Sequence, residues 1–352
     1  MNDSLFAALC GALLLCACGS VSDKPDAGGS ADACVPETDQ ELCGSSGCET
    51  ASFTDRCGTT RSVDCGSCAT GLGCVVNTCK TPVCTTFNYA VQTLATFSRT
   101  GVEDTLGAAT PDGSVIVLIP TATGSSCGAF TVSIADEIAP GSGTYNTQSI
   151  TAALTGKTIV AQDSYAITTD GLTLIARSPD STKWVQVSRS AKGMTDFGEP
   201  EETAFAQINA ALPAGASVFA PVISADGLQF IYSVSVASNT AVSGIYSSVR
   251  TSTTVPFPAG AKLGAPISDY AYASALSSDR LTLFVFYAFS GRVFTRTSTS
   301  GDWVNPNAPA DPPLLGGWQQ KPLANCARML AMGNAAGSGG CQNEDILVLN
   351  RQ

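Results

Sequence analysis

The sequence contains no histidine among its 352 residues, and this absence removes several classes of enzyme at once. A Ser-His-Asp triad, a Cys-His dyad and a histidine-ligated metal site all need an imidazole that the chain does not have. Chemistry that uses only carboxylates stays open. We therefore expect a protein that is not an enzyme, with a carboxylate-based enzyme as the alternative.

Charged residues are also scarce, at 13% of the chain against ~25% in ordinary soluble domains. The formal net charge is −11, from 18 Lys and Arg against 29 Asp and Glu. Nucleic-acid phosphates and anionic lipid head groups both attract basic surfaces. The sequence therefore predicts no nucleic-acid partner and no membrane docking by charge alone. Hydrophobic residues make up 44% of the chain, which is enough for a folded core.

The apolar run at residues 5–17, LFAALCGALLLCA, is shorter than the roughly 20 residues of a transmembrane helix and fits the core of a signal peptide. The run ends in Leu15-Cys16-Ala17-Cys18, which resembles the lipobox of bacterial lipoproteins. That resemblance implies cleavage before Cys18 and two or three acyl chains on it, enough for durable membrane anchoring. The first four residues include no Lys or Arg, which departs from the pattern, and a signal peptide without lipidation is the alternative.

We accordingly expect a signal peptide at residues 1–17 and a flexible tether at residues 18–33, which are small, polar and rich in Gly. The expected location is the cell envelope, at the outer membrane or cell surface, with the lipid as the link to the membrane.

Residues 34–84 form a cysteine-rich segment with few apolar side chains, so disulfides are expected to hold its shape. Zinc is the alternative, but Cys65-Gly-Ser-Cys68 lacks a second close pair at zinc-ribbon distance. We expect no metal and no cofactor. The segment resembles short disulfide-rich modules near the N-termini of bacterial surface lipoproteins, which implies a stalk.

The cysteine count predicts one bond between this segment and the rest of the chain. Of 15 cysteines, three lie at or before the lipobox position, and nine of the other twelve fall within residues 34–84. Nine is odd, so one must pair outside the segment. We predict Cys84 with Cys127, and Cys326 with Cys341 across a Gly-rich hairpin.

From residue 85 onward the sequence predicts β-structure, and one phrase recurs. The phrase has Ser or Thr two residues before an Asp, then an apolar run, and its copies contain Asp112-Gly113, Asp170-Gly171, Asp226-Gly227 and Asp279-Arg280. A degenerate fifth copy occupies residues 325–330. A second phrase follows each copy and is predicted to form a third strand that ends in an exposed arginine. These arginines are Arg189, Arg250, Arg296 and Arg351, and a weak first instance of the phrase occupies residues 130–134.

Asp-Gly between two apolar runs is a hairpin signal, and repeats of this length are typical of propellers. The phrase resembles the WD40-like repeat of TolB-type propellers over residues 98–352. The resemblance implies an all-β propeller spanning residues 85–352, with five blades from five copies or, alternatively, six. The chain ends on a third strand, so residues 88–97 are expected to supply the missing outer strand and close the ring.

The repeated aspartates are interpreted as turn residues, with a calcium site or a channel lining as the alternative. Residues 178–184 are similar to a sialidase Asp-box without its central glycine, and we expect a β-turn there. The acidic residues Glu199, Glu201 and Glu202 are expected in a solvated loop, and Trp303 and Trp318 as packed aromatics rather than ligand platforms.

These features predict a monomeric, lipid-anchored envelope protein. Its propeller would act as a non-catalytic binding or scaffold module for a protein or a glycan. The alternative is a carbohydrate-active hydrolase or lyase that uses carboxylates at the channel mouth. Two carboxylates roughly 5–10 Å apart in a concave pocket would favour that enzyme.

Overall fold

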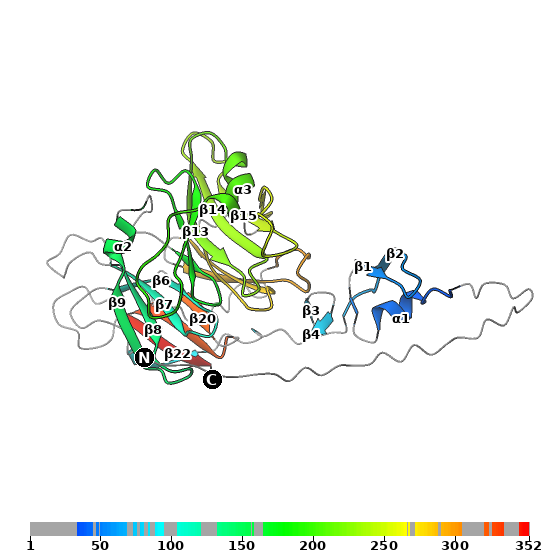
Figure 1. The fold of residues 1–352 in the computed structure, drawn as a ribbon, viewed down its shortest axis with the longest axis horizontal. Coiled ribbons are helices and arrows are strands. Elements are labelled where there is room, and N and C mark those ends of the chain that lie inside the picture. The colour runs from blue at the N-terminus through cyan, green and yellow to red at the C-terminus, as the bar shows by residue number, and fades with distance from the viewer. Residues whose placement is uncertain are drawn as a thin grey trace, which may run out of the picture.

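The computed structural model describes much of the chain from Cys34 to Arg351 as short strands (Figure 1). The described residues are 34–44, 47–48, 50–68, 73–75, 78–80, 84, 89–94, 104–120, 132–155, 157, 165–265, 267, 272–287, 290–304, 320–323, 326–333 and 345–351. The predicted signal peptide and tether, with Cys18, lie outside these residues, as do Cys127, Trp318 and Cys341. No helix in the described ranges is both long and apolar enough to cross a membrane.

The cysteine-rich segment folds into one short helix and two small hairpins. The elements are α1 (Asp39–Cys43), β1 (Thr50–Thr54) paired with β2 (Thr60–Asp64), and β3 (Gly73–Val75) paired with β4 (Thr78–Lys80). Four disulfides join these pieces: Cys34–Cys57, Cys43–Cys65, Cys48–Cys74 and Cys68–Cys79. Three sulfurs, of Cys48, Cys68 and Cys79, lie within 4.8 Å of one another, but all three are in disulfides rather than free to bind a metal.

The rest of the described chain forms five antiparallel sheets of three or four strands. Four are sequential meanders, and the fifth is a meander of three strands with β5 added at its edge. The first contains β6 (Asp104–Ala109), β7 (Val115–Pro120), β8 (Ser133–Glu137) and β9 (Tyr145–Ser149), and the second β10 (Ala166–Ile167), β11 (Thr173–Arg177) and β12 (Trp184–Ser188). The third contains β13 (Ala216–Ile223), β14 (Gln229–Val236), β15 (Gly244–Val249) and β16 (Ala261–Lys262), and the fourth β17 (Tyr272–Leu276), β18 (Thr282–Tyr287) and β19 (Ser290–Thr295). The fifth contains β20 (Gln320–Leu323), β21 (Arg328–Gly333), β22 (Asp345–Arg351) and β5 (Tyr89–Leu94). Short helices α2 (Thr151–Thr155), η1 (Thr203–Phe205) and α3 (Ala206–Ala211) lie between strands.

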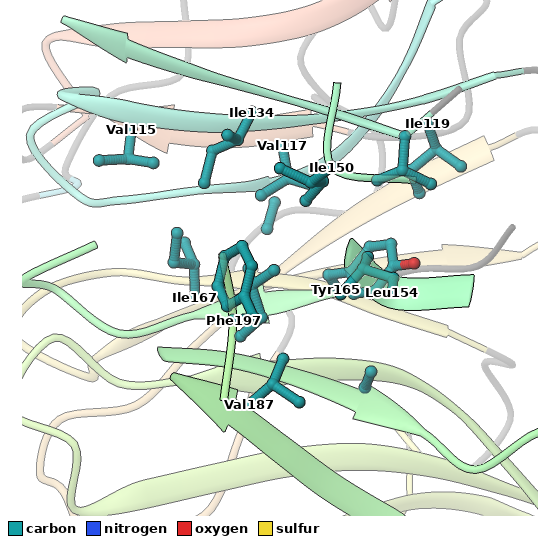
Figure 2. Packing of buried hydrophobic residues seen from close by; sticks show 14 of the residues in the cluster. Val115, Val117, Ile119, Ile134, Ile150, Leu154, Tyr165, Ile167, Val187 and Phe197 are labelled. Atoms are coloured by element: carbon teal, nitrogen blue, oxygen red, sulfur yellow. The ribbon is translucent and has the colours of Figure 1, made fainter. Parts of the chain in front are cut away.

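The sheets are arranged around a common centre through their first strands. In chain order, β6 contacts β10, β10 contacts β13, β13 contacts β17, β17 contacts β20, and β20 returns to contact β6. The second strand of each sheet is apolar on both faces because each sheet packs against two neighbours. Figure 2 shows one such interface, where Val115 and Val117 of the first sheet face Ile167 and Phe197 of the second. This arrangement is a β-propeller.

The two ends of the described body meet in one sheet. Strand β5, from the start of the propeller, pairs antiparallel with β22, the last strand of the chain, so that Tyr89 lies opposite Arg351. The expectation that residues 88–97 complete the last sheet is confirmed for the strand β5. Because the edge strand comes from the other end of the chain, the pairing closes the ring.

A fifth disulfide connects the cysteine-rich segment to the propeller and corrects the predicted pairing. Cys84 is bonded to Cys326, so both pairings proposed from the sequence, Cys84 with Cys127 and Cys326 with Cys341, are wrong. The prediction that one cysteine of the segment reaches into the propeller is confirmed. The physical reason is that β5 begins beside the end of β22, and the β20–β21 turn that carries Cys326 lies at that same end of the sheet.

Candidate binding pocket

The repeat phrase folds into the same hydrogen-bonded turn between the first and second strands of four sheets. In the first copy the Thr110 hydroxyl donates to Asp112 Oδ1 at 2.6 Å, and the same oxygen accepts from the Ser114 backbone N–H at 2.9 Å. The Val115 N–H donates back to Thr110 Oγ1 at 3.0 Å. Asp170, Asp226 and Asp279 accept the equivalent bonds in their own turns. One carboxylate oxygen of each aspartate, Oδ1, is therefore occupied by turn chemistry, as interpreted from the sequence.

The residue after each aspartate has a left-handed backbone conformation, which glycine adopts at little cost. Gly113, Gly171 and Gly227 have φ of 75°, 73° and 70°, and Arg280 takes the place of glycine at φ 61°. The Asp-box-like residues form the same turn between β11 and β12, with the Ser178 hydroxyl on Asp180 and Ser181 at φ 60°. The expected β-turn is therefore present there.

The arginines that end the third strands are buried or half-buried, so the prediction that they are exposed is wrong for the three the structure describes in full. Each donates its Nε–H to the carbonyl of the residue at the glycine position of its own turn: Arg189 to Gly171 at 3.0 Å, Arg250 to Gly227 at 2.8 Å and Arg296 to Arg280 at 2.8 Å. Each guanidinium also lies over an aromatic ring, Phe197, Phe257 and Trp303 respectively. The arginine therefore holds the turn to the rest of its sheet.

Two of these arginines also reach the preceding sheet. Arg189 forms a two-pronged ion pair with Asp136 of β8, with Nη1 at 2.7 Å from Oδ2. Both side chains are nearly inaccessible, at 0% and 8%. Arg296 donates from Nη2 to Gln229 Oε1 at 2.9 Å. The third-strand arginine thus joins neighbouring sheets as well as the turn within its own.

A pocket lies at the centre of the ring, near the end where these turns gather. The cavity itself has a volume of about 50 Å³, and about 610 Å³ of space lies free of protein atoms when its opening to solvent is included. All five sheets contribute, through the first strands β6, β10, β13, β17 and β20 and the turns that follow several of them. The lining is mostly small or apolar, with Ser274, Ser277 and Thr169 among its hydroxyl side chains.

Lys321, on β20, supplies the charged side chain in the described lining of this pocket. Its Nζ donates to the backbone carbonyl of Ser274 on β17. Burial lowers the pKa of the Lys321 ammonium from 10.5 to about 8, because the charged form loses hydration that the surrounding protein replaces only in part. Sequence reasoning did not single out Lys321. Its strand precedes the degenerate fifth copy of the repeat, so no pattern placed it at the centre of the ring.

The carboxylates considered from the sequence lie away from this pocket. Glu199 pairs with Lys157 at 3.0 Å and is largely exposed, and Glu202 pairs with Lys183 at 3.3 Å and is about half exposed. Among the described residues that line the pocket there is no Asp or Glu. Trp303 is 9% exposed beneath Arg296, as expected for a packed aromatic.

No protein-family model matches the chain, and no curated protein sequence matches it. Among solved structures, a GH62 hydrolase in complex with xylotriose aligns at TM-score 0.45 with 9% identity, covering 75% of this chain and 97% of that one. The RS223 β-xylosidase aligns at TM-score 0.45 with 7% identity, covering 74% and 94%. A putative TolB from Agrobacterium tumefaciens aligns at TM-score 0.37 with 14% identity, covering 67% and 73%. These likenesses extend to the fold alone.

Proposed function

We propose that this protein is a lipid-anchored binding module of a bacterial cell envelope, and that its ligand enters the central pocket. The observation that carries the proposal is the pocket itself. It is concave, is built by all five sheets, and combines an apolar lining with a few polar groups, which is the usual make-up of a binding site. Its described lining has no carboxylate, which favours binding over acid–base chemistry.

The proposal includes a domain division and a blade count. Residues 1–17 are the signal peptide, residues 18–33 the tether, residues 34–84 the disulfide module and residues 85–352 the propeller. The five sheets in the described residues are taken as five blades. The circle of contacts among their first strands and the β5–β22 pairing support five over six.

The anchor is tested separately from the binding site. A Cys18→Ser variant expressed in bacteria is expected to leave the membrane fraction and to lose metabolic labelling with palmitate, while a Cys16→Ser variant keeps both. Retention of the Cys18→Ser variant in the membrane fraction, with no palmitate label on either protein, would show that another feature holds the chain there.

The binding function is tested by affinity capture from solubilised envelopes with a matched pair of variants. Thr169→Trp places a large side chain at the pocket, and Thr240→Trp makes the same change in the β14–β15 turn, at the opposite end of its sheet. A partner that the unaltered protein and Thr240→Trp recover, and that Thr169→Trp does not, supports the proposal. Equal recovery by all three proteins, or by none, contradicts it.

A carbohydrate-active hydrolase is the second candidate, since two of the similar solved structures are of a GH62 hydrolase bound to xylotriose and a β-xylosidase. A hydrolase of the two-carboxylate type needs its acids roughly 5–10 Å apart around the scissile bond. The described pocket lining does not supply them. Release of reducing sugar from xylan by the unaltered protein and not by Thr169→Trp would establish this candidate over the binding module.

A further inference from the structure

The pocket holds a positive charge without a negative partner among the described residues. Lys321 takes part in no ion pair in this part of the chain, and the Ser274 carbonyl is the acceptor that the structure gives its ammonium. An ammonium has three N–H donors, so at least two remain to be satisfied by water or a ligand. Lys321 is partly exposed as a residue, but its ammonium lies at the pocket, where a charge that loses water is costly until a group of opposite charge pairs with it. The site is therefore arranged to receive an anion.

The remainder of the lining indicates what kind of molecule carries that anion. Ala108, Ile167, Val222 and Pro322 are examples of its small or apolar walls. The described lining holds neither Asn nor Gln, and its aromatic side chain is Tyr165. Such walls match a compact aliphatic group. A sugar presents several hydroxyls that need side-chain partners, and the Thr169 and Ser277 hydroxyls of the lining already donate to the Ala225 carbonyl and to Asp279. The ligand group is thus an anion attached to a small apolar body.

We propose that the pocket binds the C-terminal carboxylate of a peptide or protein whose last residue is small and apolar, with Lys321 as the cation that pairs with the carboxylate. The inference rests on the proposed binding function and names the partner for that same pocket. Capture of a C-terminal carboxylate is one of the recurring modes of peptide recognition. A charge-assisted bond inside a pocket is stronger than a neutral one, so the carboxylate supplies much of the selectivity.

The pairing predicts a dependence on pH. The protonated form of Lys321 binds the carboxylate, and the free protein loses that proton at about pH 8. Affinity is therefore expected to be steady between pH 6 and 7 and about tenfold weaker at pH 9 than at pH 7. The described charged side chains in the turns that follow these strands are engaged within the turns or between sheets, namely Asp112, Asp170, Asp226, Asp279 and Arg280.

The experiment uses the detergent-solubilised full chain and fluorescent peptides ending in Gly-Ala-Ala-Val, one with a free carboxylate and one with a C-terminal amide. Binding is measured by fluorescence anisotropy. The free acid is expected to bind at least tenfold more tightly than the amide. Lys321→Met, which keeps the aliphatic stem, is expected to remove this preference. Lys262→Met is the matched control, because Lys262 also donates to a backbone carbonyl, that of Ala241, but lies away from the pocket.

Each outcome decides the inference. Equal affinity for acid and amide, or unchanged binding by Lys321→Met with a native thermal melt, overturns the role of the carboxylate. Tighter binding of glucuronate than of the peptide acid overturns the peptide and assigns the pocket to acidic sugars. If neither peptide binds, this inference is overturned. The proposed binding function still stands in that case if the capture experiment recovers a partner with the unaltered protein and not with Thr169→Trp, so the two failures are distinguishable.

Discussion

Replacing Lys321 by Met is expected to stabilise the protein at neutral pH, which is unusual for a substitution at the centre of a fold. The Lys321 pKa falls from 10.5 to about 8 on folding, so the charged side chain disfavours the folded state by about 3 kcal/mol below pH 8. Methionine keeps the stem but removes the bond to the Ser274 carbonyl, which costs about 1 kcal/mol. The net expected gain is about 2 kcal/mol at pH 7.

The sign of the pH dependence follows from which state binds the proton. Between pH 8 and 10.5 the unfolded chain keeps the Lys321 proton and the folded chain has lost it, so wild-type stability gains from this residue as pH rises through that window. The advantage of Lys321→Met therefore shrinks over the window. Above it the variant is expected to be about 1 kcal/mol less stable than the wild type, for want of the hydrogen bond.

Urea denaturation followed by circular dichroism at pH 7, 8, 9 and 10 measures the difference directly. Other titrating groups are common to the two proteins and cancel in the comparison. Lys262→Met is the control and is expected to show a difference near zero at every pH. A Lys321→Met variant that is less stable at pH 7, or a difference that does not change with pH, would refute the reasoning.

Three further predictions concern the structure around the pocket. Arg189→Met leaves the Asp136 carboxylate buried without its partner and is expected to cost about 3–5 kcal/mol in urea unfolding, so a loss below 1 kcal/mol would contradict the buried pair. Ser181→Gly removes a side chain from a backbone at φ 60° and is expected to gain about 1 kcal/mol, with a lowered melting temperature as the contrary result. Replacing Cys84 and Cys326 together by Ala opens a cross-link between residues 242 positions apart and is expected to cost up to about 5 kcal/mol by chain entropy, whereas an unchanged midpoint would exclude that contribution.

The hairpin turns were predictable from the sequence because their physics is local. The Thr110 hydroxyl, the Asp112 carboxylate and the left-handed Gly113 all lie within four residues of one another and satisfy each other's hydrogen bonds. A short motif therefore carries the whole structural signal wherever it recurs. The closing strand was also predictable, since residues 88–97 read as a strand that precedes the first copy of the repeat, and β5 within them pairs with β22.

The pocket and the long disulfide were not predictable in the same way, because both depend on how the ring brings distant residues together. Cys326 lies 242 positions from Cys84, and their proximity follows from the entry of β5 beside β22. Lys321 on β20 faces Ser274 on β17, the first strand of the neighbouring sheet, and no recognised motif precedes the turn after β20. The odd number of cysteines in residues 34–84 indicated that one of them bonds to the propeller. Identifying Cys326 as the partner of Cys84 required the strand register of the fifth sheet.

The first sheet shows why the second phrase was weak in its first instance, at residues 130–134. Its third strand, β8, ends in Glu137 at the position that arginine occupies in the later sheets, and Glu137 instead accepts from the Gly141 and Gly143 backbone N–H groups. The turn carbonyl of Gly113, which an arginine would satisfy, accepts from the Tyr145 hydroxyl at 2.7 Å. What recurs from sheet to sheet is therefore a side-chain donor to the turn carbonyl. In the first sheet this donor is a tyrosine from the fourth strand instead of an arginine after the third strand, so a position-by-position comparison of the repeats does not find it.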